Sequence, residues 1–314
     1  MLLYAFRRIG LAAVIMLMTM ILLFSMVYLV PGDPASIALG PRATQAMKDA
    51  LRQRMGLDQP IAMQLWNFVA NVLRGDLGID VWSNRSVAAI VFEALPYTLV
   101  LTSVSIAWAI LLGIPMGAYS AVARNSWIDR LVGVLSVGAI AIPSFIVAVY
   151  SLLVFAVWLK WLPAIGAGSQ GDFVAQARHL VLPSFAIGLG WVGYIARLVR
   201  ASMLEVMGEN HIRTARAFGL PERRILFRYA LRIAILPTVA LLGVGIGHLL
   251  SGAVFAEIVF ARPGVGKLTY DAVITRNFPV VMGSVLVTTA LYALCTLLSD
   301  LAAAWLDPRV RTSL

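Results

Sequence analysis

Two glycine patterns in this sequence have spacings that are associated with phosphate binding. Gly188, Gly190 and Gly193 fit G-x-G-x-x-G, but a dinucleotide site needs that pattern directly after a strand, in a βαβ unit. Here the pattern lies inside a long apolar stretch, where glycines let helices approach one another closely. We therefore interpret these three glycines as packing residues.

The second pattern, Gly264-Val265-Gly266-Lys267, is similar to the end of a phosphate loop. Ala261 stands where that loop has its first glycine, and Leu268 stands where a Ser or Thr would bind magnesium. The chain is therefore not expected to bind ATP or another cofactor itself.

No constellation for bond cleavage or metal binding is visible. The three histidines are far apart, no H-E-x-x-H occurs, and no apolar stretch carries the acidic pair of an intramembrane protease. The only cysteine, Cys295, excludes a disulfide within the chain and a cysteine metal cluster. His248, Glu257 and Asp300 lie in or at the ends of apolar stretches and are functional candidates. For His248 the alternative is a structural hydrogen bond between helices.

The elements that carry these residues are long and apolar. Of the 314 residues, 61% are hydrophobic and 13% are charged, against about 50% and about 25% in soluble domains. Asp, Glu, Lys and Arg are absent from six stretches, namely 9–32, 94–123, 131–159, 180–196, 233–256 and 277–299. Each approaches or exceeds the roughly 20 residues with which a helix crosses a bilayer. The sequence thus predicts an all-α integral membrane protein with six transmembrane helices.

The basic residues indicate how these helices are oriented. With the N-terminus in the cytoplasm, the interior ends and loops carry fourteen Lys and Arg residues, and the short exterior loops carry five. Such an excess is typical of the cytoplasmic side. We therefore expect both termini in the cytoplasm, and the net charge of +10 needs no nucleic acid to explain it.

Two hydrophilic segments interrupt the apolar stretches. The first is an extracytoplasmic cap that opens on the turn-forming Pro31-Gly32-Asp33-Pro34 and contains two short helices, near 43–55 and 60–74. The second, residues 204–236, is rich in helix formers and lies on the cytoplasmic side. The expected divisions are an N-terminal end with the first span, the cap, a core of five spans that includes 204–236, and a cytoplasmic tail: 1–30, 31–97, 98–305 and 306–314.

The 204–236 segment should form two short helices joined at Gly219, which ends the first helix and is followed by Pro221. Glu209 and Arg213 have the spacing of a favourable i, i+4 pair. One apolar face is expected on the first helix, at Leu204, Met207, His211, Ala215 and Phe218. On the second helix a basic stripe is expected opposite an apolar face: Arg224, Arg228 and Arg232 against Ile225, Leu226, Tyr229 and Ile233. A basic hairpin that only satisfies the positive-inside pattern is the alternative.

At this segment the sequence resembles a known family. The run Arg213-Thr214-Ala215-Arg216-Ala217-Phe218-Gly219, followed by Ile235-Leu236-Pro237, is similar to the EAA loop of binding-protein-dependent ABC importer permeases, with the longer spacing of the dipeptide and oligopeptide group. Other matching motifs run along the whole chain: Pro31-Gly32-Asp33-Pro34, Gly56-Leu57-Asp58-Gln59-Pro60, Gly75-Asp76-Leu77-Gly78, Ile142-Pro143-Ser144-Phe145, Leu180-Val181-Leu182-Pro183, and Glu257 through Pro263-Gly264-Val265-Gly266. Phe218 stands where the group usually has Lys, and Ser86 where it usually has Pro.

The resemblance implies a type I importer permease fold in the bacterial inner membrane. It implies a second, non-identical permease subunit, ATPase subunits that bind ATP and magnesium, and an extracytoplasmic substrate-binding protein. It also implies that residues 213–219, with Arg224 and Arg228, form a coupling helix and surface for the ATPase. A substrate path between the two permeases would include Ser144, His248 and Ser251.

Di- and oligopeptides are the expected cargo, while relatives of this type also carry glutathione, nickel chelates or sugars. The main alternative is a secondary transporter driven by an ion gradient, which would show internal repeats and intramembrane ion ligands. An intramembrane hydrolase is a second alternative, and the missing catalytic constellation argues against it.

Overall fold

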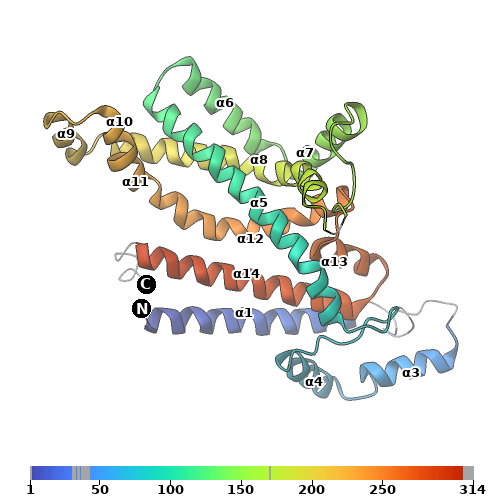
Figure 1. The fold of residues 1–314 in the computed structure, drawn as a ribbon. Helices are drawn as coiled ribbons and strands as arrows, with labels where there is room; N and C mark the ends of the chain where they lie inside the picture. Colours follow the sequence, from blue (N-terminus) through green and yellow to red (C-terminus); the bar gives the residue numbers. More distant parts are fainter. Residues whose placement is uncertain (1, 30–32, 34–35, 37–42, 170, 307–314) are drawn as a thin grey trace. The chain divides into compact units, whose positions relative to one another are not determined.

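The computed structural model describes residues 2–29, 33, 36, 43–169 and 171–306, and helices account for most of them (Figure 1). In this part of the chain no strand is present, although an isolated antiparallel bridge pairs Ile79 with Ser86. The predicted turn residues Pro31, Gly32 and Pro34 and the tail beyond residue 306 lie outside the described residues.

The contacts divide the chain into two compact units. The central unit contains Leu99–Arg262 and the chain from Cys295 onward, and the terminal unit contains Leu2–Thr98 and Pro263–Leu294. Helices α5 (Val87–Val122) and α14 (Phe278–Leu306) contribute to both.

The predicted spans are largely present as helices. α1 (Leu2–Leu29), α5, α8 (Phe173–Val206) and α14 are each long and apolar enough to cross a membrane. The pair formed by α6 (Trp127–Ala141) and the following α7 (Ser144–Ser151), which continues as a π-helical stretch to Trp158, can make a fifth span. The fifth predicted stretch corresponds to α12 (Leu236–Val259), a helix of 24 residues. The integral membrane class is confirmed, and the count of six stays a prediction.

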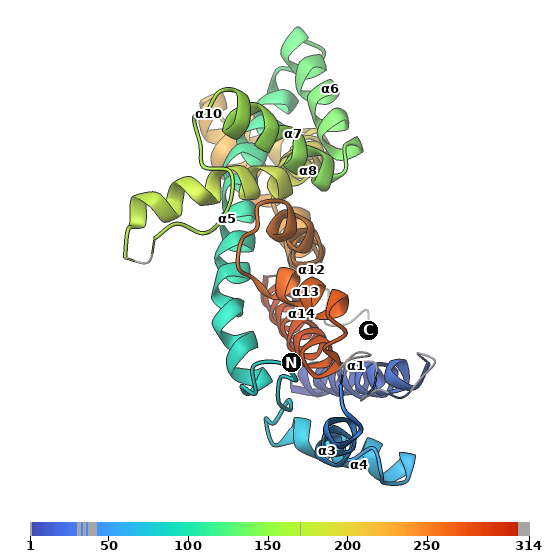
Figure 2. The same ribbon diagram turned by 90° about the vertical axis from the view of Figure 1, so that its right-hand side faces the viewer.

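The third predicted span is not one continuous helix. α6 and α7 meet at 98°, on either side of Ile142 and Pro143 (Figure 2). Proline has no N–H to continue the helical ladder, and it pushes the preceding residue into an extended conformation. Ile142 shows that conformation, with φ −86° and ψ 120°.

In the terminal unit the two predicted cap helices are confirmed as α3 (Gln45–Met55) and α4 (Ile61–Leu73). Thr44 caps the start of α3 through its side chain, and Gly56 ends it in the left-handed conformation at φ 65°. α4 packs on α1, where Phe24 and Phe68 stack with their ring centroids 6.3 Å apart. Asp33 accepts a hydrogen bond from Arg52 Nε at 3.0 Å, which ties the chain after α1 to α3.

A second tie in the terminal unit joins the loop before α5 to the turn before α14. The Asp80 carboxylate is buried and accepts hydrogen bonds from the side chains of Ser83 and Asn277 and from the Trp82 N–H. Burial acts to raise the pKa of Asp80, but the hydrogen bonds outweigh it and hold that pKa below its ordinary value. Ser86, which ends this loop, accepts the Ile90 N–H through its carbonyl at the start of α5.

In the central unit α8 is the helix around which the others pack. Gly113 and Gly117 let α5 approach so closely that a Cβ at either position would overlap Ile195 or Ala196 of α8. Gly193 does the same for α6, because a Cβ there would stand 2.6 Å from Ser136 O. These contacts confirm that glycines in the spans, those of the G-x-G-x-x-G pattern included, serve helix packing.

One ion pair joins these helices at the start of α6. Asp129 is buried and receives two hydrogen bonds from the Arg200 guanidinium of α8, at 2.6 and 2.8 Å. The Ser120 hydroxyl of α5 and the Asn125 N–H complete its partners, at 2.5 and 2.9 Å. This network, which sequence reasoning missed, joins α5, α6 and α8.

Candidate functional site

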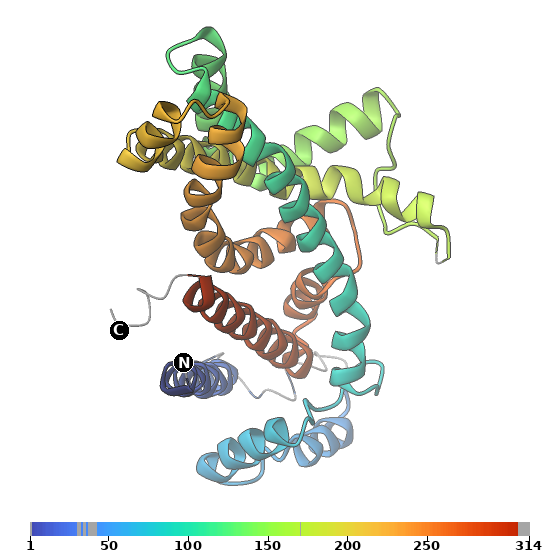
Figure 3. The same cartoon turned by 60° about the vertical axis from the view of Figure 1, so that its left-hand side comes forward.

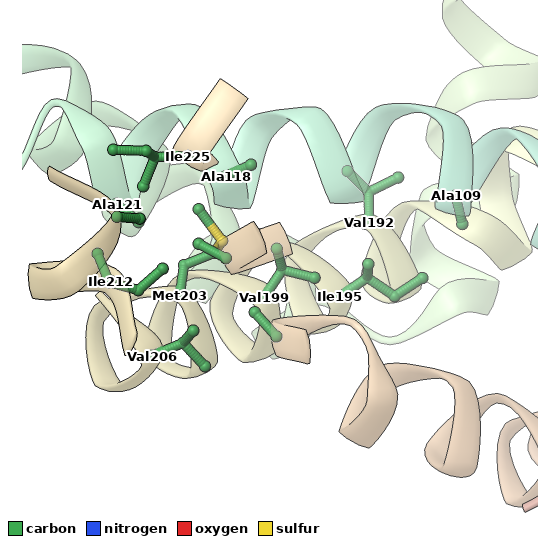
Figure 4. Packing of buried hydrophobic residues seen from close by; sticks show 13 residues of the cluster. Ala109, Ala118, Ala121, Val192, Ile195, Val199, Met203, Val206, Ile212 and Ile225 are labelled. Atoms are coloured by element: carbon green, nitrogen blue, oxygen red, sulfur yellow. The ribbon is translucent and has the colours of Figure 1, made fainter. Parts of the chain in front are cut away.

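The 204–236 segment packs against one end of α8 and of α5 (Figures 1 and 3). It consists of α9 (Asn210–Ala217) and a helix built from α10 (Glu222–Arg224), a π-helical stretch Ile225–Ala230 and α11 (Leu231–Ala234). Ile212 and Ile225 enter a cluster with Met203 and Val206 of α8 (Figure 4), and Ala215 belongs to the same cluster. The segment is thus a packed part of the central unit and not a loose linker.

The prediction of one continuous helix from Leu204 to Phe218 was wrong. α8 ends at Val206, and α9 begins only at Asn210. Because Glu209 precedes α9 in an extended conformation (φ −75°, ψ 157°), its side chain is not placed for an i, i+4 pair with Arg213. Its carboxylate lies 3.0 Å from His211 Nδ1 instead.

Gly219 confirms the prediction of a left-handed helix stop. Its φ is +73°, and it follows Phe218, the C-cap residue of α9. The Gly219 N–H donates to Arg216 O at 2.9 Å and the Leu220 N–H donates to Ala215 O at 3.2 Å, which is the pair of bonds in a Schellman motif.

An ion pair closes the turn that follows. Arg216 Nη2 donates to Glu222 Oε1 at 2.7 Å, so the end of α9 and the start of α10 are held together across Gly219. The hydrogen bond from Arg216 lowers the pKa of Glu222 below its ordinary value, and the carboxylate raises the pKa of Arg216.

The apolar face of the second helix differs from the predicted one. Ile225 is buried as expected, but Tyr229 and Ile233 are exposed, and Ala230 and Ala234 take the buried positions. The cause is the π-helical stretch, whose backbone bonds run five residues apart, as in Leu231 N–H to Leu226 O. The extra residue in that turn shifts every later side chain around the helix by one position.

The predicted coupling residues form an exposed surface with one exception. Ala215 is buried in the cluster below α9. Phe218 was expected on the apolar face but is 80% exposed, because the helix ends there and turns at Gly219. The other predicted residues are exposed: Arg213, Thr214, Arg216, Ala217, Gly219, Arg224 and Arg228.

A second candidate site is a cavity of about 420 Å³ at the break between α6 and α7. α6 and α7 provide Ala139, Ile140, Ile142, Pro143 and Ser144; α8 provides Ala186, Ile187, Gly190, Trp191 and Tyr194; α12 provides Leu241, Gly245, His248 and Gly252. Of the predicted path residues, Ser144 and His248 line it and Ser251 does not. The Ser251 hydroxyl donates to Gly247 O at 3.4 Å, within α12.

Sequence reasoning missed the two aromatic residues of this cavity. Trp191 and Tyr194 lie one turn apart on α8, with ring centroids 5.8 Å apart and planes tilted by 58°. Gly245 makes room for the Trp191 ring, because a Cβ at that position would overlap it. The sequence signal that could have located this cavity is Pro143, since a proline within a span frees backbone carbonyls that need hydrogen-bond partners.

The pattern near Gly264 has a structural explanation. The Val265 N–H, at the start of α13 (Val265–Ile274), donates to the Thr98 hydroxyl at 2.9 Å, so a loop N–H is already used inside the terminal unit. Lys267 pairs with Asp271 in the same helix. Of the other candidates, Glu257 is fully buried on α12, while the side chain of Asp300 lies outside the described part.

The sequence matches two family models over nearly its whole length. Residues 113–312 match the binding-protein-dependent transport system inner membrane component, and residues 1–102 match the N-terminal part of the same kind of membrane component. The chain belongs to this family.

Relatives in this family match nearly the full length of the chain. The glutathione transport system permease protein GsiC of Pectobacterium atrosepticum is 38% identical over 296 residues, 94% of each chain. The proteins of the same name from Shigella flexneri and Escherichia coli K12 are 36% identical over 305 residues, 97% of each chain. An inward-facing structure of the MetNI methionine ABC transporter superposes with a TM-score of 0.58 at 22% identity, covering 69% of this chain and 96% of that chain.

These matches confirm the fold class, a type I importer permease fold, in a multi-pass inner-membrane protein. The chain is a permease subunit of an ABC importer and, as such, not itself an enzyme.

Proposed function

We propose that this permease forms part of the translocation path of an importer for short peptides, glutathione among them. The observation that carries the proposal is the identity of 36 to 38% with glutathione permeases over nearly the whole of both chains. Glutathione is a tripeptide, so it falls within the peptide class expected from the sequence. No observation favours an ion-gradient-driven transporter.

We propose further that the chain works beside a second, non-identical permease, with two ATPase subunits on the cytoplasmic side and a binding protein outside. ATP and magnesium are bound by the ATPase subunits, and this chain binds no cofactor. The exposed surface around Phe218, Gly219 and Arg224 supports the assignment of 213–219 as the coupling helix. We propose Ser144 and His248, which line the cavity, as residues of the substrate path. Ser251 does not line the cavity, so its place in the path rests on the sequence prediction alone.

The uptake test uses a strain that lacks its own glutathione and peptide importers. Expression of this chain with its partner genes should give uptake of labelled glutathione or trialanine that vanadate blocks and a protonophore leaves intact in ATP-loaded vesicles. The chain reconstituted alone should give none. Uptake that a protonophore abolishes and vanadate spares would exclude an ATP-driven importer.

The orientation test uses single cysteines in a Cys295→Ala background. Ser169→Cys should react with a membrane-impermeant thiol reagent in intact cells, and Glu222→Cys should react only after the cells are opened. Both side chains are exposed, so accessibility depends on the side of the membrane. Labelling of position 222 from outside would reverse the orientation and remove the coupling assignment.

A further inference from the structure

The cavity at the α6–α7 break has a lining that indicates the chemistry of its ligand. None of the fourteen lining residues is Asp, Glu, Lys or Arg. A charged group that leaves water for a site without an opposite charge loses its hydration and gains no ion pair. The part of a ligand that enters this cavity is therefore uncharged.

The break supplies hydrogen-bond acceptors to the same cavity. In a continuous helix the carbonyl of Ala139 would accept the N–H of residue 143, but Pro143 has none. The Ala139 oxygen faces α8, since a Cβ on Gly190 would stand 3.4 Å from it, and both residues line the cavity. A backbone carbonyl at membrane depth needs a donor, which a ligand with an N–H group supplies and a hydrocarbon chain does not.

The remaining walls suit an apolar or aromatic group. Trp191 and Tyr194 present two rings from consecutive turns of α8. Ser144 and His248 add a hydroxyl and an imidazole, which orient a ligand without adding a fixed negative charge. The volume of about 420 Å³ is in the range of small-molecule sites.

We propose that this cavity binds the uncharged middle of a short peptide during transport. A peptide N–H donates to the Ala139 carbonyl, the neighbouring side chain packs on Trp191 and Tyr194, and the charged ends of the peptide lie outside the cavity. This inference rests on the proposed function, because it names the cargo chemistry of the same path.

Gly252 allows the cavity to be filled without disturbing the helices. A Cβ at this position would meet only Ile187 Cγ2 at 3.7 Å and Ser144 Oγ at 4.0 Å, which are ordinary contacts. Gly252→Leu therefore places its side chain in the cavity. Gly133→Leu on α6 is the matched control, because a Cβ there has nothing within 4 Å.

The measurement is uptake kinetics of the complete transporter with triglycine and with Gly-Phe-Gly. Gly252→Leu should raise the KM for Gly-Phe-Gly by about tenfold or more, while triglycine changes much less. Gly133→Leu should change both by less than about twofold. Membrane level and ATPase co-purification are measured in each strain, and Gly252→Ala provides a milder filling should the leucine variant be lost from the membrane.

A charge introduced into the cavity gives an independent test. Ser144→Asp should favour Gly-Lys-Gly over Gly-Leu-Gly by about fivefold relative to the wild type. Ser103→Asp is the control, because Ser103 is exposed on α5 and does not line the cavity. The same shift in both variants, or none in either, would overturn the assignment.

The two levels of inference fail differently. Wild-type uptake that vanadate does not inhibit would reject the ATP-driven importer, whatever the variants do. Vanadate-sensitive uptake with equal KM values in Gly252→Leu and Gly133→Leu would be consistent with the ATP-driven importer and would reject the cavity as its peptide site.

Discussion

The turn at Gly219 allows a sharp test of the proposed coupling segment. Gly219 has φ +73°, and a Cβ there would have nothing within 4 Å. The effect of a substitution is therefore confined to the backbone conformation. A residue with a Cβ loses about 1–2 kcal/mol in the left-handed region, and a β-branched residue is disfavoured more strongly. For Gly219→Val this shifts the equilibrium of the turn by roughly 5- to 30-fold.

We expect that shift to act on coupling and not on folding. Ile212 and Ala215 still anchor α9 in its cluster, so membrane level should be unchanged, while uptake falls and the ATPase dissociates or hydrolyses ATP without transport. Faster hydrogen exchange of the amides at positions 219 and 220 in Gly219→Val should report the loss of the two hydrogen bonds that Gly219 and Leu220 donate in the wild type. Gly219→Asn is the matched control, because Asn tolerates the left-handed region. Normal uptake in Gly219→Val, or equal loss in Gly219→Asn, would refute the reasoning.

Two further predictions concern the ion pairs. Asp129→Ala leaves Arg200 without its carboxylate and should destabilise the protein by about 3 kcal/mol. The measurement is a lower melting temperature in detergent. Arg130 is an exposed neighbour, so Arg130→Ala should have the melting temperature of the wild type. The hydrogen bond from Arg52 lowers the pKa of Asp33 from 3.8 to about 2. Since the folded state holds this proton more weakly than the unfolded chain does, the stabilisation is complete above pH 3.8 and is lost as the pH falls through about 2. The protection factors of the α3 amides against hydrogen exchange should fall over that window in the wild type and stay constant across it in Asp33→Asn.

Local signals predicted much of this structure. Long uncharged stretches predicted the spans. The glycine at position 219 predicted the turn that ends the helix, because few other residues adopt positive φ without a loss of free energy. The helices of the cap were also predicted within two residues of their ends. Each of these features depends on residues close together in the sequence.

The features that were missed depend on contacts between distant residues. A 3.6-residue period cannot reveal a π-helical turn, so the buried face after Ile225 was placed one residue too early, at Tyr229 and not at Ala230. Pro143 alone does not specify the 98° bend, which depends on how α7 packs on α8 and α12. The position of Trp191 in the cavity wall could not be predicted from its neighbours in the sequence, because its ring fits only where Gly245 of another helix leaves room for it.

The position of Trp191 links the two candidate sites. It packs against the cluster that holds α9 and also against the cluster beside the cavity. α8 runs without interruption from Trp191 to Met203, a distance of about 18 Å at 1.5 Å per residue. If the ATPase displaces α9 as proposed, the displacement would reach the cavity through one continuous helix, and Trp191 is where it would change the cavity wall. The free energy by which the ATPase favours an open over a closed cavity cannot exceed the difference in its binding free energy to the two conformations. A variant that uncouples α9 should therefore leave the affinity for peptide unchanged and abolish the dependence of that affinity on ATP.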